Sequence, residues 1–147
     1  MRQHYPLRPR RRRKGVARLL VLDTSVVSYI FKKDSRASYY LQQAQGSRAL
    51  ISFQTLEELW HGAYFGGWGH RRKHELANHL KGYTVIWPSD RLVNVCAQLR
   101  ADRKVAGRTL QSADAWIAAT AILLQCPPAS HDRDFSGIPG LIVIQAP

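Results

Sequence analysis

Short apolar segments alternate along this chain with longer stretches in which apolar residues recur every three or four positions. Recurrence at i, i+3, i+4 and i+7 is typical of an amphipathic helix, and a short apolar run bounded by polar residues is typical of a buried strand. We therefore expect strands at residues 19–22, 49–53, 83–87, 126–131 and 141–144. Helices are expected between them, over residues 26–31, 37–44, 55–65, 70–81, 89–106 and 113–124.

Polar residues and glycines mark where these elements begin and end. Thr55 and Glu58 have the spacing of a capping box, which predicts a helix that starts at Thr55. Ser89 can cap the helix that follows the third strand. Gly46 and Gly107 stand where helices are expected to end.

The alternation of short strands with helices predicts an α/β layered fold with a mainly parallel sheet. A length of 147 residues suits one domain, and a content of 45% hydrophobic and 22% charged residues is typical of a globular domain. No apolar run has the about 20 residues that a membrane-spanning helix requires, so no membrane span is expected. Ligands bind at the carboxyl ends of strands in such sheets, and the functional site is expected there.

The net charge of +12 is concentrated near the amino terminus. Residues 1–18 hold eight of the 22 Lys and Arg residues and no acid, so the other residues carry a net charge of only +4. We expect residues 1–17 to be a basic extension that stays solvated, and residues 18–147 to form the domain. Two interpretations of the extension remain open, namely an upstream extension of the reading frame and an arm that binds RNA phosphates.

The cysteines and histidines do not indicate a disulfide framework or a zinc site. Cys96 and Cys126 lie in apolar contexts and form no CxxC motif, so they are expected to be buried thiols. His70 and His74 are four residues apart, but no third ligand accompanies them. The composition therefore favours a cytoplasmic enzyme or binding domain.

Five of the ten acidic residues lie at expected strand ends or helix starts. Asp23 ends the first strand, Glu58 lies in the first turn of the next long helix, and Asp114 lies in the first turn of the last helix. Asp132 follows the fourth strand, and Asp134 comes two residues later. Asp23, Glu58 and Asp132 should converge at one edge of a parallel sheet. Asp114 joins them only if the connection before it reaches that edge.

Each of these acids also has a purely structural interpretation. Glu58 can complete the capping box, and Asp23 can cap a helix. Asp114 suits the helix dipole, and the other two acids suit a turn. Clustered carboxylates nevertheless repel one another and raise one another's pKa, so four of them at one edge indicate a hard divalent cation. Carboxylate oxygens and water are the ligands that Mg²⁺ and Mn²⁺ prefer.

The segments that carry these acids resemble the ordered motifs of PIN-domain nucleases. They are residues 21–26 (VLDTSV), 55–62 (TLEELWHG), 112–119 (SADAWIAA) and 131–135 (HDRDF), and residues 137–141 (GIPGL) resemble the VapC-type toxins of that family. The resemblance covers about residues 18–145. Ser130 stands where the family usually has Thr. Pro127 and Pro128 stand in a strand that is usually apolar, so that strand is expected to be shortened or displaced.

The resemblance implies a three-layer αβα sandwich with a mainly parallel sheet of about five strands, and a homodimer. It implies a metal-dependent endoribonuclease that is the toxin of a type II toxin–antitoxin pair, with RNA as substrate and a small VapB-like antitoxin that covers the site. It also implies that Mg²⁺ or Mn²⁺ is held by Asp23, Glu58, Asp114 and Asp132, with Asp134 as a competitor for Asp132.

A cation held by these carboxylates would lower the pKa of bound water and neutralise the charge that develops on the phosphate. We expect Asp23 and Asp114 to be direct ligands and Glu58 to orient or deprotonate the attacking water. Hydroxyl groups that could hold a carboxylate or a phosphate are those of Thr24, Ser25 and Ser130. The candidates for a basic rim that binds RNA, with an ordinary solvated face as the alternative, are Arg103, Lys104, Arg108 and Arg133.

Other functions compete with this interpretation. A phosphatase of the haloacid-dehalogenase type also begins with an Asp after the first strand, but its second acid would fall at Ser25. A non-toxin PIN-like nuclease and an inactive RNA-binding regulatory domain are further alternatives, and the presence of all four acids disfavours the inactive one. A DNA nuclease remains open, because metal-assisted phosphodiester cleavage does not itself select the sugar.

Overall fold

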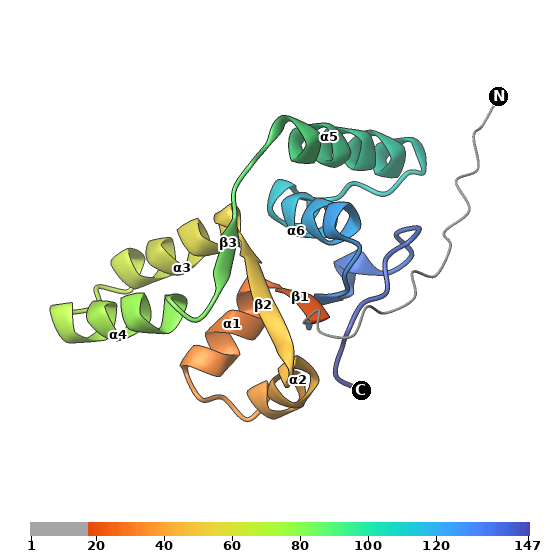
Figure 1. Cartoon of the computed structure of the whole chain (residues 1–147). Coiled ribbons are helices and arrows are strands. Elements are labelled where there is room, and N and C mark those ends of the chain that lie inside the picture. The colour runs from red at the N-terminus through yellow and green to blue at the C-terminus, as the bar shows by residue number, and fades with distance from the viewer. Residues whose placement is uncertain (1–17) are drawn as a thin grey trace.

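The computed structural model describes residues 18–147, so the expectations for residues 1–17 lie outside the described residues. A parallel four-stranded sheet in the order β3-β2-β1-β4 forms the centre of the domain, with helices on both faces (Figure 1). The strands are β1 (Arg18–Leu22), β2 (Ser47–Ser52), β3 (Thr84–Ile86) and β4 (Pro128–Ala129). The predicted α/β class and αβα layering are confirmed.

The helices form two layers, and each layer has its own hydrophobic core. One layer contains α1 (Thr24–Phe31), α2 (Ala37–Ala44), α3 (Phe53–Phe65) and α4 (His70–Leu80), and the other contains α5 (Asp90–Val105) and α6 (Ser112–Leu124). Side chains alternate along β1, so that Leu20 and Leu22 pack into the first core and Val21 packs into the second. None of the described helices is long and apolar enough to cross a membrane.

The carboxyl-terminal part of the sheet is shorter than the sequence pattern predicts. β4 has two residues, and the expected strand at 141–144 is reduced to one parallel bridge between Ala129 and Ile144. Prolines have no backbone N–H, so this segment contributes carbonyl groups: Pro127 O accepts from Val21 N at 3.1 Å and Pro128 O accepts from Ile144 N at 2.8 Å. The expected shortening of this strand is thus observed.

The start of α3 differs from the predicted capping box. α3 begins at Phe53 because Ser52, at the end of β2, is the N-cap residue and its hydroxyl accepts from Gln54 N at 3.2 Å. Thr55 is buried instead, and its hydroxyl oxygen accepts from the Thr24 hydroxyl at 3.0 Å. The prediction of a cap at Thr55 was wrong, and Glu58 therefore lies in the second turn of α3 rather than the first.

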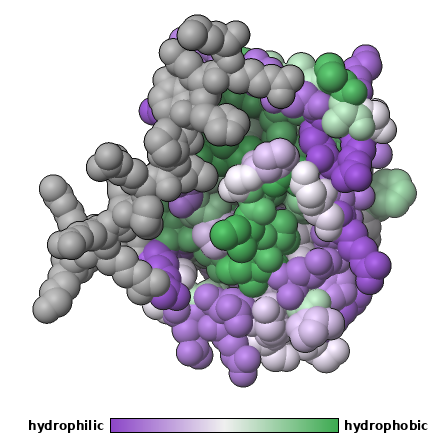
Figure 2. Space-filling model, turned by 90° about the vertical axis from the view of Figure 1, so that its right-hand side faces the viewer, coloured by the Kyte–Doolittle hydropathy of each residue, from purple (hydrophilic) through white to green (hydrophobic). Residues whose placement is uncertain are grey.

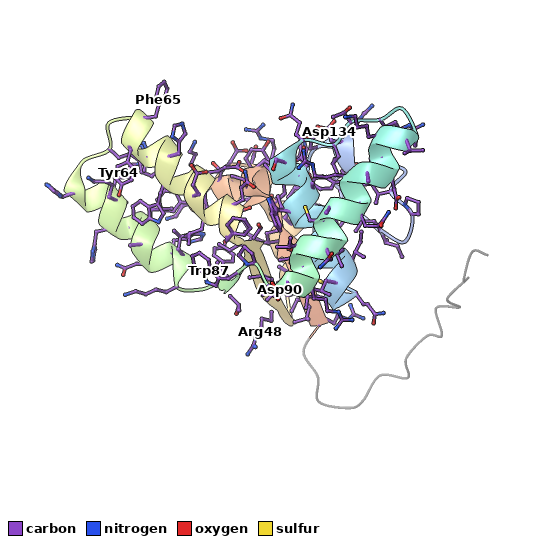
Figure 3. The ribbon with its side chains drawn as sticks, turned by 90° about the horizontal axis from the view of Figure 1, so that it is seen from above. Arg48, Tyr64, Phe65, Trp87, Asp90 and Asp134 are labelled. Carbon is purple, nitrogen blue, oxygen red and sulfur yellow. The ribbon has the colours of Figure 1, made fainter. Side chains whose placement is uncertain are left out.

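Apolar side chains are exposed at three places on the surface. Figure 3 shows Tyr64 and Phe65 at the end of α3 that lies away from α5 and α6, where their side chains are 66% and 87% exposed. Trp87, which is 62% exposed, lies where the chain passes from β3 to α5. Figure 2 shows an apolar area bordered by hydrophilic residues on another face of the molecule.

Candidate active site

Asp23 is a buried carboxylate at the carboxyl end of β1. It is the N-cap residue of α1, and Oδ1 accepts from the backbone N–H of Thr24 at 2.7 Å. Oδ2 accepts from the hydroxyl groups of Ser130 at 2.7 Å and Ser25 at 3.4 Å. Burial, which leaves this residue 7% exposed, raises the pKa of Asp23 although these hydrogen bonds favour the charged form. The carboxylate is therefore held firmly against the sheet edge.

Three further carboxylates gather in front of this edge. Asp114 lies in the first turn of α6, and Asp132 and Asp134 lie at the start of a short 3₁₀ helix, η1 (Arg133–Phe135). One oxygen atom from each of the three lies within 4.8 Å of the others. The connection before α6 thus brings Asp114 to the edge where β1 ends, which the order of elements alone left undecided.

The Ser130 hydroxyl links the buried carboxylate to this group of three. It donates to Asp23 Oδ2 and accepts from the backbone N–H of Asp132 at 3.0 Å. Asp132 Oδ1 in turn accepts from the backbone N–H of Asp134 at 3.0 Å. These bonds set the turn that presents Asp132 and Asp134 to Asp114.

Glu58 reaches the same region from the second turn of α3. Its carboxylate is half-buried, and Oε1 has no hydrogen-bond partner among the described residues. Burial raises the pKa of Glu58, the Thr24 hydroxyl partly offsets this by favouring the charged form, and the neighbouring charges of Asp23 and Glu57 raise the pKa further. An orphaned carboxylate oxygen of this kind requires a proton, a cation or ordered water in the functional protein.

The charges of the other four acids all affect the pKa of Asp114. Its pKa rises to about 7, first because of burial and then because of the charges of the other four acids, namely Asp23, Asp132, Asp134 and Glu58. Such mutual repulsion costs stability unless a positive charge offsets it. The donor set consists of carboxylates with no thiol, which fits a hard divalent cation such as Mg²⁺ or Mn²⁺.

A cavity of about 850 Å³ opens in front of the acids. The predicted site residues Asp23, Thr24, Ser25, Glu58, Asp114, Asp132 and Arg133 line it. The cavity also has an apolar part, formed by Phe31, Leu59, Trp68 and Leu76. Trp68 stacks on Phe31 and carries the guanidinium of Arg72 over its ring at 3.9 Å, so this tryptophan belongs to the cavity wall.

Three predicted basic residues lie elsewhere. Arg103 and Arg108 line a second cavity, of about 740 Å³, between α5 and the turn at residues 137–139. Arg103 is buried and does not line the acidic cavity, so both the basic rim and the alternative of a solvated face were wrong for this residue. Lys104 is exposed on α5 and lines neither cavity. Of the four basic residues proposed for the rim, Arg133 is the one that borders the acids.

Sequence reasoning missed an aromatic group beside the acids. The His131 ring packs edge-on against Tyr29 at 5.8 Å and Tyr40 at 6.2 Å between ring centroids. His131 Nδ1 lies 3.0 Å from the Tyr40 hydroxyl, and His131 and Tyr29 both line the acidic cavity. The sequence offered one signal of this aromatic group, namely that His131 directly precedes Asp132. Tyr40 is 91 residues from His131 along the chain, and the apolar periodicity around Tyr40 indicates only a helix.

Comparison with known proteins places this architecture in a family. Residues 20–141 match the PIN domain family. The structure is similar to a chain of VapBC2 from Rickettsia felis bound to a promoter DNA fragment, with 22% identity, a TM-score of 0.77 and coverage of 88% of this chain and 99% of that one. It is also similar to a chain of a toxin–antitoxin complex from Klebsiella pneumoniae, with 25% identity, a TM-score of 0.67 and coverage of 84% and 95%.

A third similar structure is VapBC-1 from nontypeable Haemophilus influenzae, with 21% identity, a TM-score of 0.71 and coverage of 86% of this chain and 97% of that one. A search of curated proteins gave no match. The structural similarities demonstrate a common fold, and the family match spans most of the domain, from β1 to the turn that follows η1. This protein therefore belongs to the PIN domain family.

Proposed function

We propose that this protein is a metal-dependent endoribonuclease and the toxin of a toxin–antitoxin pair. The observation that carries the proposal is the cluster of three carboxylates in which oxygen atoms of Asp114, Asp132 and Asp134 lie within 4.8 Å of one another. Two of them, Asp114 and Asp132, line the acidic cavity. Membership of a nuclease family supports the reaction class. A structural role for the group is disfavoured, because its members repel one another.

In this proposal the three clustered carboxylates hold Mg²⁺ or Mn²⁺, and Asp23, at the end of β1, is the fourth carboxylate ligand. When bound, the cation supplies charge neutralisation at the phosphate and a more acidic water. Ser130 and the Thr24 N–H keep Asp23 oriented toward the site. Since both Asp132 and Asp134 approach Asp114, we propose that both contribute rather than one in place of the other.

Glu58 is the proposed proton acceptor for the attacking water. It lines the same cavity as Asp114 and Asp132, and its Oε1 is buried without a hydrogen-bond partner among residues 18–147. A carboxylate whose oxygen is not engaged by the protein is available to orient a water molecule. Its neighbour Glu57 is exposed on the same helix, so it provides a matched control.

The substrate in this proposal is single-stranded RNA. Proteins bind unpaired nucleotides by stacking bases on aromatic rings and by placing cations near the phosphates. Tyr29 and His131 supply rings beside the acids, and Lys32 and Arg133 supply positive charges on the same cavity wall. We infer that these four residues contact the nucleotides next to the scissile phosphate.

We also propose that a VapB-like antitoxin covers this cavity and that the toxin is a homodimer in the cytoplasm. The apolar part of the cavity, with Phe31, Leu59 and Trp68, suits apolar side chains of a partner, and the carboxylates suit a partner's basic side chain. Tyr64 and Phe65 are unusually exposed for aromatic side chains and suit a protein interface. The similar structures from R. felis and H. influenzae are VapBC complexes, which supports an antitoxin partner.

The decisive experiment is cleavage of total cellular RNA with Mg²⁺ or Mn²⁺ by the wild type, by Asp114→Asn and by Asp90→Asn. Asp90 is the matched control, because it is also a first-turn acid of a helix but does not line the acidic cavity. We expect cleavage by the wild type and the control, loss of cleavage in Asp114→Asn, and loss with EDTA. Metal-independent cleavage, or equal cleavage by all three proteins, would contradict the proposal, and cleavage of single-stranded DNA alone would move the substrate to DNA.

A further inference from the structure

Arg103, on α5, is a buried cation without a counter-ion. Its side chain is 8% exposed, and no carboxylate of residues 18–147 lies within 4.0 Å of it. Its guanidinium makes one hydrogen bond, from Nη1 to the carbonyl oxygen of Gly137 at 3.2 Å. Nε is buried and has no partner in the described part of the chain. Residues 1–17 contain no acid that could pair with it.

This situation is energetically unfavourable for an arginine. A guanidinium stays protonated at all physiological pH values and has five N–H donors. Here Nη1 donates to Gly137, whereas the buried Nε donor has no partner among the described residues. Buried charges in stable proteins are normally paired with an opposite charge. The adjacent Asp102 does not serve, because it forms no ion pair with Arg103 and instead accepts from Gln98 Nε2 at 2.8 Å. Within the described structure, Arg103 therefore lacks a counter-ion and an acceptor for its Nε–H.

A second arginine approaches the same turn. Arg108 Nη1 lies so close to Gly137 that a Cβ atom at this residue would be 3.0 Å from it. Gly137 also has a φ of +74°, which disfavours any other residue. Both guanidinium groups thus contact Gly137, Arg103 through its carbonyl oxygen and Arg108 at its Cα side.

Both arginines line the second cavity, which has a volume of about 740 Å³. The rest of its wall is largely apolar and includes Leu99, Ile122 and Pro139. The turn that forms one side of it comes directly after η1, the element that carries Asp134. The cavity is accordingly joined to the candidate active site by a segment of a few residues, although it shares no lining residue with it.

We propose that this cavity is a phosphate-binding site in which Arg103 and Arg108 hold the oxyanion. Guanidinium groups match the oxygen geometry of phosphate and form charge-assisted hydrogen bonds with it. An anion here would supply the negative counter-charge that Arg103 lacks. The cavity is lined by two arginines and one carboxylate, that of Asp102, so the net charge of its lining is positive. The phosphate belongs either to the RNA backbone or to a free phosphate group. The binding site itself does not depend on nuclease activity, and only the RNA source rests on the proposed function.

The test is a titration of metal-free protein with inorganic phosphate at constant ionic strength, with chloride as the reference anion. The backbone amide signal of Gly137 in a ¹⁵N NMR spectrum reports on binding at the turn. We expect a saturable shift in the wild type and a dissociation constant raised about tenfold or more in Arg108→Gln and Arg103→Met, as for loss of a hydrogen bond between charged groups. Arg100→Gln, an exposed arginine of the same helix, should bind phosphate as the wild type does.

The results of this titration either support or overturn the proposed phosphate site. An absent Gly137 shift, or equal binding by the wild type, Arg108→Gln and Arg100→Gln, would overturn the proposal. The Arg108 side chain is exposed and makes no hydrogen bond among the described residues, and the backbone N–H that donates to Arg103 O at 2.9 Å is retained in any variant. The substitution Arg108→Gln should therefore leave the fold intact even if Arg103→Met does not fold. Binding that Arg108→Gln weakens and Arg100→Gln does not supports the proposal.

A second arm identifies the source of the phosphate. A short 2′-O-methylated oligoribonucleotide, which resists cleavage, replaces inorganic phosphate. If it shifts Gly137 and Arg108→Gln weakens its binding, the site holds a backbone phosphate of RNA. If only inorganic phosphate shifts Gly137, the ligand is a free phosphate group. Loss of cleavage in Asp114→Asn is independent of both arms, so failure of this inference is distinguishable from failure of the proposed function.

Discussion

Removal of the charge at Asp114 should stabilise the metal-free protein while it abolishes activity. The folded-state pKa of Asp114 is about 7, against an ordinary value of 3.8. Because the pKa is raised on folding, the native state binds the proton more tightly than the unfolded state does. The contribution of this carboxyl to stability is therefore fully present below about pH 4, falls as the pH rises toward 7, and stays at its low value above pH 7.

The magnitude follows from the size of the shift. A change from 3.8 to about 7 corresponds to about 4 kcal/mol if it is fully realised. Asp114 is only half-buried, so screening by solvent reduces this to about 1–2 kcal/mol. Asparagine has nearly the same volume and no charge, so Asp114→Asn should gain this amount at pH 8. A domain of this size should then melt about 3–6 °C higher.

The assay is thermal unfolding followed by circular dichroism at pH 5 and pH 8 in metal-free buffer, with Asp90→Asn as the control. The advantage of Asp114→Asn over the wild type should grow by about 1 kcal/mol from pH 5 to pH 8. Addition of Mg²⁺ should stabilise the wild type and not the variant, because a bound cation stabilises the native state by mass action. An Asp114→Asn protein that is no more stable than the wild type at pH 8, or a pH-independent difference, would refute the reasoning.

The remaining predictions concern activity. Glu58→Gln should lower kcat at least about 100-fold, as expected for loss of a general base, whereas Glu57→Gln should retain activity in the same RNA-cleavage assay. Asp132→Asn and Asp134→Asn should cause similar losses of metal affinity in a Mn²⁺ titration, because each offers an oxygen atom within 4.8 Å of an Asp114 oxygen; a loss confined to one of them would identify a single ligand. His131→Ala should raise KM for RNA several-fold with little change in kcat. A change in kcat alone would show that His131 does not contribute to substrate binding.

Local patterns in the sequence were sufficient for the fold class and for most element boundaries. The apolar run at residues 19–22 predicts a strand that is covered on both faces, and its side chains do alternate between the two cores. Ser89 caps α5 as expected, with its hydroxyl accepting from Leu92 N at 3.1 Å. These features depend on residues a few positions apart, and for this reason the sequence alone was enough to predict them.

The position of the α3 start was beyond such local rules. Ser52 and Thr55 are both good N-cap residues, three positions apart, and each satisfies the pattern of a helix start. The structure selects Ser52 because Thr55 is buried against Thr24, at the start of a different helix. The choice was made by a contact between segments 31 residues apart.

For the acids of the candidate site, too, local sequence predicted some features and contacts between distant segments decided the others. The sequence by itself determined that Asp23 ends a strand and that Asp114 begins a helix. Only the tertiary structure decided that Asp134 joins Asp132 beside Asp114, and that His131 packs between Tyr29 and Tyr40. Arg103 is buried by the turn at residues 137–139, although its charge predicts a solvated face. Periodicity determines which side of an element faces inward, whereas burial and proximity depend on which distant segment packs there.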